Sequence, residues 1–200
     1  MKIVCIGRNY GAHAKELGNT IPEEPVVFLK PATALIPIGG PIRLPAFSND
    51  IHHEIELVYE LERNVEVVRA RGVSIGLDLT ARDIQQRLKE QGLPWEKAKA
   101  FDGSAYVALP FHAVKELGDH YQTFQLKRNG QVVQEGHNGE MIFDLKTLIA
   151  CADRYFRLQT GDLLFTGTPA GVGPIAPGDR LEGFLNDERC FDLLVEGPAH

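Results

Sequence analysis

The chain has 200 residues, of which 44% are hydrophobic and 24% are charged, and its formal net charge is −6. This length supports one domain with a substantial core, and the composition is that of an ordinary globular protein. The acidic balance argues against a nucleic-acid-binding surface, which needs a basic face. No stretch approaches the roughly 18 apolar residues of a membrane-spanning helix. We therefore expect a globular protein with neither a nucleic-acid nor a membrane partner.

Cysteine usage and the N-terminal sequence both indicate the cytoplasm. Cys5, Cys151 and Cys190 are scattered and form no CxxC motif, which predicts reduced thiols. The apolar run after Met1 is too short for the core of a signal peptide. We expect a cytoplasmic protein on these grounds.

Strand patterns dominate the chain. Apolar or alternating runs rich in Val, Ile and Leu predict strands at residues 2–6, 26–30, 54–61, 73–79, 124–128, 131–134, 162–166, 180–185 and 190–195. Asn129 and Gly130 separate two of these runs and tolerate positive φ, which predicts a tight hairpin turn. The prolines and glycines between Pro31 and Ser48 predict an irregular connection.

Predicted helices are few. Thr80 is expected to cap a helix that ends at Gly92, and Pro94 follows soon after. Asp144 is expected to cap a second helix over residues 145–157, which has apolar side chains on one side. Strand runs outnumber helices and do not alternate with them regularly. The sequence therefore predicts a β-rich α+β fold rather than a doubly wound sheet.

The sequence HHEIEL at residues 52–57 places two acids two positions apart. In a strand, Glu54 and Glu56 point to the same face, and a buried pair of like charges is costly without a cation. Such a pair alone is typical of a solvated strand face. Asp78 changes this interpretation, because it is a single acid in the apolar run 73–79. A buried acid of this kind needs a ligand or a basic partner.

Three carboxylates from two strands would make an all-oxygen site for a hard divalent cation. Mg²⁺ or Mn²⁺ fits such a site, and a structural Ca²⁺ is the rival ion. We expect His52 and His53 to support the site rather than bind the ion, because an oxygen site needs no imidazole.

His13 and Glu16 form a second candidate pair. They are three residues apart in the sequence GAHAKE, so they share a face of a helical turn. A carboxylate in contact with an imidazole raises its basicity and can help it to activate a water. The same spacing is also typical of an exposed ion pair.

Two further segments could meet an anion. Lys99 lies among apolar residues in the sequence AKAF, although a surface lysine is the simpler reading. Residues 165–174 take a strand into a glycine-rich turn whose N–H groups and Thr168 hydroxyl could bind a carboxylate. A plain tight turn is equally compatible with this segment, which lacks the Lys-Ser/Thr ending of a P-loop.

Seven motifs, in order along nearly the whole chain, resemble the fumarylacetoacetate hydrolase family. They are GRNYGAHAKE, EEPVVFLKP, HHEIEL, GLDLTARDIQ, GLPWEKAKAFD, EGHNGEMIFDL and GDLLFTGTPAGVGP. The similarity is greatest to bacterial acylpyruvate hydrolases and oxaloacetate decarboxylase-like members. It implies a single catalytic domain over residues 1–200, with a β-roll or distorted barrel and a few short helices. It also implies a homodimer and a lid over residues 1–20.

The resemblance also implies roles for nine residues. It implies that the metal ligands are Glu54, Glu56 and Asp78. It implies that the water-activating and charge-stabilising groups are His13, Glu16 and Lys99. It places near the substrate Arg8, Gln85 and Thr168. One departure is the stretch from Glu56 to Asp78, which is shorter than in most relatives. Most relatives have a helix there, and residues 61–71 leave little room for it.

The activity expected from this resemblance is metal-dependent cleavage of a carbon–carbon bond in acylpyruvates, such as acetylpyruvate or fumarylpyruvate, with release of pyruvate. Decarboxylation of oxaloacetate would give the same enolate, and isomerisation of 2-hydroxy-dienoate acids would use the same metal site. A different class of protein, a metal-binding structural β-domain without turnover, is a further alternative.

Overall fold

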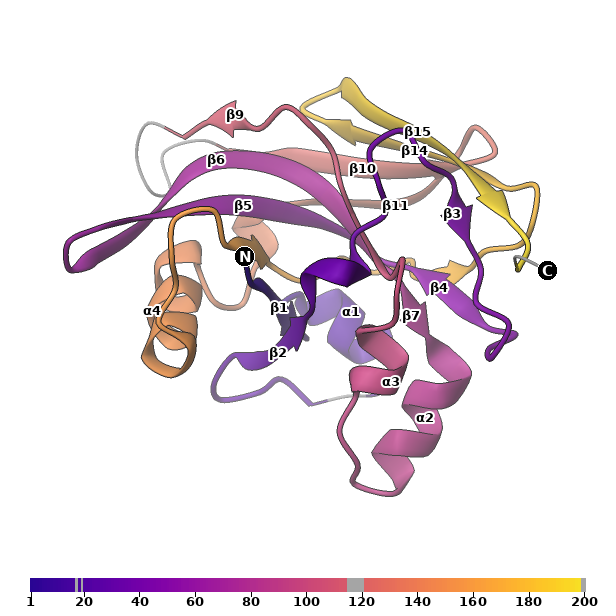
Figure 1. The fold of residues 1–200 in the computed structure, drawn as a ribbon, viewed down its shortest axis with the longest axis horizontal. Helices are drawn as coiled ribbons and strands as arrows, with labels where there is room; N and C mark the ends of the chain where they lie inside the picture. The colour runs from indigo at the N-terminus through magenta and orange to yellow at the C-terminus, as the bar shows by residue number, and fades with distance from the viewer. Residues whose placement is uncertain (17, 19, 115–120, 199–200) are drawn as a thin grey trace.

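A long antiparallel ribbon of two strands, β5 (Ile55–Asn64) and β6 (Val67–Asp78), runs through the centre of the fold. The computed structural model describes residues 1–16, 18, 20–114 and 121–198. Figure 1 shows the ribbon as a curved band, with helices on one side and further strands on the other. The predicted strand-rich α+β class is confirmed.

The ribbon belongs to a sheet with the strand order β2-β1-β12-β5-β6-β8, in which β9 also pairs with β6. Its other strands are β1 (Ile3–Gly7), β2 (Val26–Lys30), β8 (Ala105–Val107), β9 (His112–Ala113) and β12 (Leu163–Phe165). The β1–β12 pair is parallel. Other elements cover both faces of the ribbon where β5 begins and β6 ends. Most side chains in that half of the ribbon are therefore buried.

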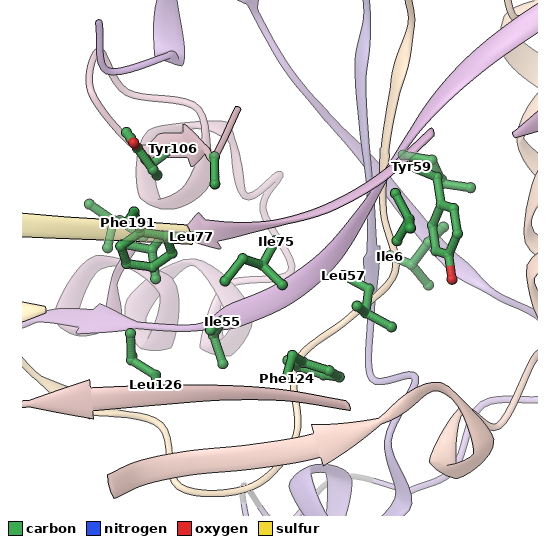
Figure 2. Close-up of a cluster of buried hydrophobic side chains, with 14 of the residues drawn as sticks. Ile6, Ile55, Leu57, Tyr59, Ile75, Leu77, Tyr106, Phe124, Leu126 and Phe191 are labelled. Carbon is green, nitrogen blue, oxygen red and sulfur yellow. The ribbon is translucent and has the colours of Figure 1, made fainter. Parts of the chain in front are cut away.

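A second sheet, in the order β11-β10-β14-β15-β3, packs against the ribbon. Its strands are β3 (Ile42–Arg43), β10 (Thr123–Arg128), β11 (Gln131–His137), β14 (Arg180–Leu185) and β15 (Glu188–Glu196). Figure 2 shows the core between them, where Ile55 and Leu77 of the ribbon lie near Leu126 and Phe191. A small third sheet joins β13 (Gly173–Pro174), β4 (Ile51–His53) and β7 (Thr80–Ala81).

The helices are short and lie outside the sheets. They are α1 (Gly11–Glu16), α2 (Arg82–Glu90), α3 (Glu96–Lys99) and α4 (Leu145–Phe156), with 3₁₀ turns at Ala32–Ala34 and Asn138–Glu140. Within the described parts of the chain, every helix is too short or too polar to cross a lipid bilayer. The segment expected to form a lid contains α1, and its residues Leu17 and Asn19 lie outside the described residues.

Several local predictions are confirmed. Asn129 and Gly130 have φ values of 54° and 78° and connect β10 to β11. The Asp144 carboxylate accepts a hydrogen bond from the Thr147 N–H at 2.8 Å and caps α4. Residues 61–71 form no helix, because β5 and β6 continue directly into one another through a hairpin turn.

The predicted cap at Thr80 is wrong. Helix α2 begins at Arg82 after Ala81, without a side-chain cap. Thr80 instead belongs to β7 and pairs with His52, and its hydroxyl donates to the Asp78 carbonyl at 3.4 Å. Pairing with a distant strand therefore outweighs the local capping preference.

Gly76 on β6 is required by close packing, since a Cβ there would lie 2.3 Å from the Tyr106 carbonyl oxygen and 2.8 Å from a Val58 methyl. We expect Gly76→Ala to lower the free energy of unfolding by at least about 2 kcal/mol, because backbone cannot easily move aside. Urea unfolding measures this change. Gly11→Ala is the control, because a Cβ there has no atom within 4 Å. Equal effects of the two substitutions would contradict the packing argument.

Candidate active site

Three buried carboxylates meet where β4, β5 and β6 come together. Glu54 lies between β4 and β5, Glu56 is on β5, and Asp78 ends β6. The Asp78 N–H donates to the Glu54 carbonyl at 2.9 Å, which holds the two chain segments in register. One oxygen of each carboxylate lies within 4.8 Å of the others, and the three residues are at most 4% exposed. The structure thus brings together the three acids that the sequence singled out.

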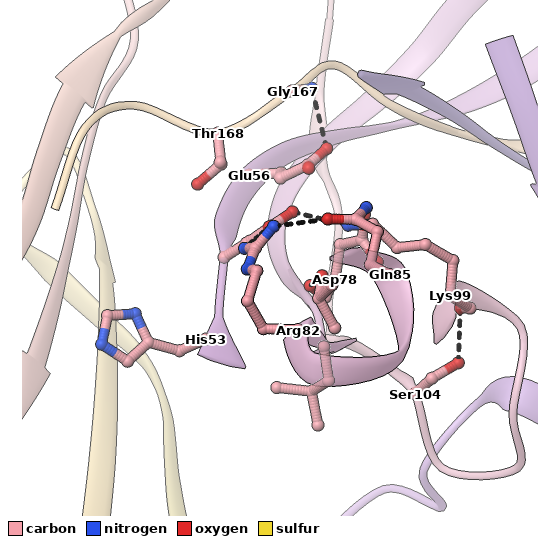
Figure 3. A network of polar contacts seen from close by, with 12 residues as sticks. His53, Glu56, Asp78, Arg82, Gln85, Lys99, Ser104, Gly167 and Thr168 are labelled. Atoms are coloured by element: carbon pink, nitrogen blue, oxygen red, sulfur yellow. Dashed lines mark hydrogen bonds and ion pairs between the residues drawn. The ribbon is translucent and has the colours of Figure 1, made fainter. Parts of the chain in front are cut away.

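Three basic side chains approach these acids. The Lys99 ammonium donates to Glu54 Oε2 at 2.6 Å and to Asp78 Oδ2 at 2.7 Å. The Lys30 ammonium lies 2.7 Å from Asp78 Oδ1. Arg82 donates to Glu54 Oε1. Figure 3 shows Arg82 and Lys99 approaching the acids from different elements, α2 and α3.

These ion pairs decide the ionisation of two groups. Burial alone would raise the pKa of Glu54, but Lys99 and Arg82 outweigh it and hold that pKa well below its usual range. Burial likewise opposes the charge on Lys99, but Asp78 and Glu54 raise the pKa of the lysine. Glu54 is therefore a carboxylate and Lys99 an ammonium at neutral pH.

Glu56 is in a different situation. Its Oε2 accepts a hydrogen bond from the Gly167 N–H at 2.8 Å (Figure 3). Burial, and then the charges of Asp78 and Glu54, raise the pKa of Glu56 well above its usual value. A cation beside Glu56 would relieve this repulsion, and the donor set consists only of carboxylate oxygens. These residues therefore fit a hard divalent ion.

His13 and Glu16 form the predicted pair on α1. His13 Nδ1 lies 3.3 Å from Glu16 Oε2, and His13 is 5% exposed. Burial lowers the pKa of His13, although Glu54 and Glu16 act in the opposite direction. Its imidazole is thus neutral at pH 7 and able to accept a proton. The Glu16 carboxylate also accepts from the Gly171 N–H at 3.1 Å, which attaches α1 to the glycine-rich loop.

A small cavity of about 30 Å³ lies over the carboxylates. All nine residues that the sequence placed at the site, except Glu16, line it, and its other lining residues are Ile6, Gly7, Phe28, Arg82, Lys89 and Trp95. Arg82 donates to Gln85 Oε1 at 2.7 Å. The Thr168 hydroxyl donates to the Ile55 carbonyl at 2.8 Å, so this group serves the backbone rather than pointing freely into the cavity.

Gln134 on β11 fixes the position of the glycine-rich loop relative to the acids. Its Oε1 accepts from Ile55 N–H at 3.1 Å and lies 2.8 Å from His53 Nδ1. Its Nε2 donates to Thr168 Oγ1 at 2.8 Å and to the Pro169 carbonyl at 3.0 Å. The expected supporting role of His53 is therefore consistent with its contact, and His52 similarly lies 2.9 Å from Asp50 Oδ1.

Lys30, Arg82 and Gln134 were not among the residues singled out from the sequence. Two of them had a usable signal. Lys30 ends an apolar strand, as Asp78 does, and Arg82 lies one helical turn before Gln85. Gln134 had none, because a glutamine in an alternating strand is ordinary.

Comparison with known proteins assigns the chain to a family. Residues 2–190 match the model described as "Fumarylacetoacetate (FAA) hydrolase C-terminal". The chain belongs to the fumarylacetoacetate hydrolase family.

Relatives with named activities are similar over most of their length. The oxaloacetate tautomerase YcgM of Escherichia coli is 43% identical over 188 residues, covering 90% of this chain and 86% of that protein. The mitochondrial oxaloacetate decarboxylase of Dictyostelium discoideum is 41% identical over 207 residues, covering 97% of this chain and 94% of that protein. A crystal structure of fumarylpyruvate hydrolase from Pseudomonas aeruginosa, in complex with Mn²⁺ and pyruvate, superposes with a TM-score of 0.88. It is 33% identical and covers 100% of this chain and 90% of that one.

Glu56→Gln tests whether the acids form a cation site. The amide cannot ionise but can still accept from Gly167, so we expect metal-free protein to be at least as stable as the wild type at pH 7. Its affinity for Mg²⁺ or Mn²⁺ should fall more than about tenfold, the lower bound for losing an outer-shell partner. Thermal melts in EDTA and with added metal measure both effects.

Glu60→Gln is the matched control for this experiment. It lies on the same strand but is half-buried and paired with Arg71. It should leave metal affinity unchanged. Metal binding by Glu56→Gln equal to that of the wild type would contradict the cation site.

Proposed function

We propose that this chain is a divalent-metal-dependent enzyme that interconverts the enol and keto forms of oxaloacetate. The observation that carries the proposal is a trio of buried carboxylates facing Lys99 in a cavity of about 30 Å³. The three acids and Lys99 all line this cavity, so a 2-oxo acid bound there would lie beside both the acids and the ammonium. The activities for which two relatives are named, oxaloacetate tautomerase and oxaloacetate decarboxylase, support this substrate.

Glu54, Glu56 and Asp78 would hold Mg²⁺ or Mn²⁺. Bound there, the ion supplies a Lewis acid for the carboxylate and keto oxygens of a 2-oxo acid. The all-oxygen donor set supports either Mg²⁺ or Mn²⁺. The fumarylpyruvate hydrolase structure contains Mn²⁺, which supports that ion. Ca²⁺ is the ion expected if the site is only structural.

The residues of the chain perform the proton transfer. His13 Nε2 takes a proton from C3 of the keto form, because Nδ1 is directed at Glu16. The electron pair of that C–H bond moves to the C2 oxygen, where the Lys99 ammonium stabilises the enolate charge. His13 then returns the proton it took, directly or through a water, to that oxygen, which completes the enol and leaves the imidazole neutral again. If the C3–C4 bond breaks instead, carbon dioxide leaves and the same kind of enolate remains, so decarboxylation can share the site.

Hydrolysis of acylpyruvates is the second candidate. It is favoured by the contact between His13 and Glu16 at 3.3 Å, which suits activation of a water that would attack the distal carbonyl. The carbon–carbon bond then breaks and pyruvate enolate leaves. This candidate needs room for both a longer substrate and a water.

The direct test is a screen of purified protein with oxaloacetate, acetylpyruvate and fumarylpyruvate, each with and without Mg²⁺ or Mn²⁺. Enol–keto conversion is followed by ultraviolet absorbance, and pyruvate release by a coupled assay. We expect metal-dependent conversion of oxaloacetate to be the fastest reaction. Faster pyruvate release from an acylpyruvate would replace the first candidate with the second. Stabilisation by Ca²⁺ alone, with no turnover and no effect of oxalate, would favour a structural domain.

His13→Ala separates the reactions. Tautomerisation and hydrolysis both require a base, so each should slow at least about 100-fold. Decarboxylation requires the metal and Lys99 but no base, so it should change less than about threefold. Binding of oxalate to the Mg²⁺-loaded variant, measured by calorimetry, controls for the integrity of the site. Tautomerisation at the wild-type rate would contradict the role of His13.

The pH profile reports the same imidazole. Only neutral His13 accepts a proton, so kcat/KM should fall as the pH falls through its pKa, which burial holds below the ordinary value of about 6.5. The hydrogen bond and charge of Glu16 raise this pKa. Glu16→Gln should therefore move the acidic limb to a lower pH. A shift to higher pH would contradict this electrostatic assignment.

A further inference from the structure

Two cations lie close to one aromatic ring at the edge of the cavity. The Arg8 guanidinium carbon lies 5.9 Å from the centroid of the Trp95 ring, and Lys89 Nζ lies 5.5 Å from the same centroid. Arg8 follows β1, Lys89 is on α2, and Trp95 precedes α3, so three separate segments converge here. All three residues line the cavity that contains the carboxylates.

These cations differ from the others at the site. Lys30, Lys99 and Arg82 each contact a carboxylate of the trio. Among the described residues, neither Arg8 nor Lys89 forms an ion pair with an acid. Arg8 Nε is buried and has no hydrogen-bond partner within the same residues. A buried donor left in this way is costly, and a ligand that accepts from it would remove the cost.

The backbone and the electrostatics agree with this reading. Arg8 has a φ of 60°, a strained conformation for a residue with a side chain. Burial, followed by the charges of Arg8 and Arg82, lowers the pKa of Lys89 to about 8. The cations thus repel each other, and a bound anion would stabilise all of them.

We propose that Arg8 and Lys89, held against Trp95, bind the distal carboxylate of the substrate. The substrate class is then the short 2-oxo dicarboxylic acids, with one end at the trio of acids and the other between these two cations. The inference rests on the proposed function for the position of the first end. The subsite would bind the distal carboxylate, which is the group that distinguishes oxaloacetate from a 2-oxo acid with an apolar tail.

Charge balance supports a dianion. With a divalent ion bound the three acids are all ionised, and Lys30, Lys99 and Arg82 match their three negative charges. Arg8 and Lys89, together with a divalent ion, leave the site with excess positive charge. A second carboxylate on the ligand reduces this excess and also places its oxygens within reach of N–H donors of fixed position. A methyl group in the same place would leave both cations without an anion.

Calorimetry with two inert ligands tests the subsite without turnover. (S)-malate and (S)-2-hydroxybutanoate share a carboxylate and a 2-hydroxyl at one end, and differ only in a distal carboxylate or methyl. We expect the Mg²⁺-loaded protein to bind malate at least about tenfold more tightly. Lys89→Met should reduce this preference below threefold, and Lys89→Arg should retain most of it. Lys97→Met is the control, because Lys97 is an exposed lysine on the neighbouring helix α3.

Kinetics then separate the subsite from the reaction. In Lys89→Met, KM for oxaloacetate should rise about tenfold while kcat changes less than threefold, because the interaction is made equally in ground and transition states. A wild-type preference for malate in Lys89→Met, or no preference in the wild type, would overturn the subsite. If malate preference depends on Lys89 but no 2-oxo acid is turned over, the subsite stands and the proposed function fails.

Discussion

The central constraint on this protein is the burial of three carboxylates within 4.8 Å of one another. Like charges at this distance in a low-dielectric interior repel strongly, so positive charge has to be brought to them. The register of β5 and β6 sets where the acids lie, with Glu56 opposite Gly76. The positions of Lys30, Lys99 and Arg82 then follow, because each must reach a carboxylate from β2, α3 or α2.

Polar contacts between distant segments hold the glycine-rich loop above the acids. Asn9 Nδ2 donates to the Thr166 carbonyl at 2.8 Å, and its Oδ1 accepts from the Phe143 N–H at 2.8 Å. Gly167 fits beside Asn9 only because it has no side chain, since a Cβ there would lie 2.8 Å from Asn9 Cβ. This tight approach presents the Gly167 N–H to Glu56. The loop therefore contributes to the site mainly through backbone, supported by buried amides.

The sequence predicted the acids well because their signal is local. Alternation placed Glu54 and Glu56 on one face, and an apolar strand made Asp78 conspicuous. The basic partners depend on tertiary packing, so no spacing connects Lys30 with Asp78 or Arg82 with Glu54. At Thr80 the local signal was misleading. Threonine is typical of helix caps, but here it pairs with His52 in a strand. Periodicity thus predicted the main strands and the trio, while the surroundings of the trio required the three-dimensional structure.

The distribution of charge bears on substrate length more than on reaction type. Oxaloacetate and fumarylpyruvate both carry a distal carboxylate, whereas acetylpyruvate ends in a methyl ketone. Cations at Arg8 and Lys89 would therefore favour the first two over the third, whichever bond is broken. Between those two, the chain of fumarylpyruvate is longer, so its distal carboxylate would extend further from the trio. The position of Arg8 and Lys89 relative to the acids would therefore select for substrate length as well as for charge.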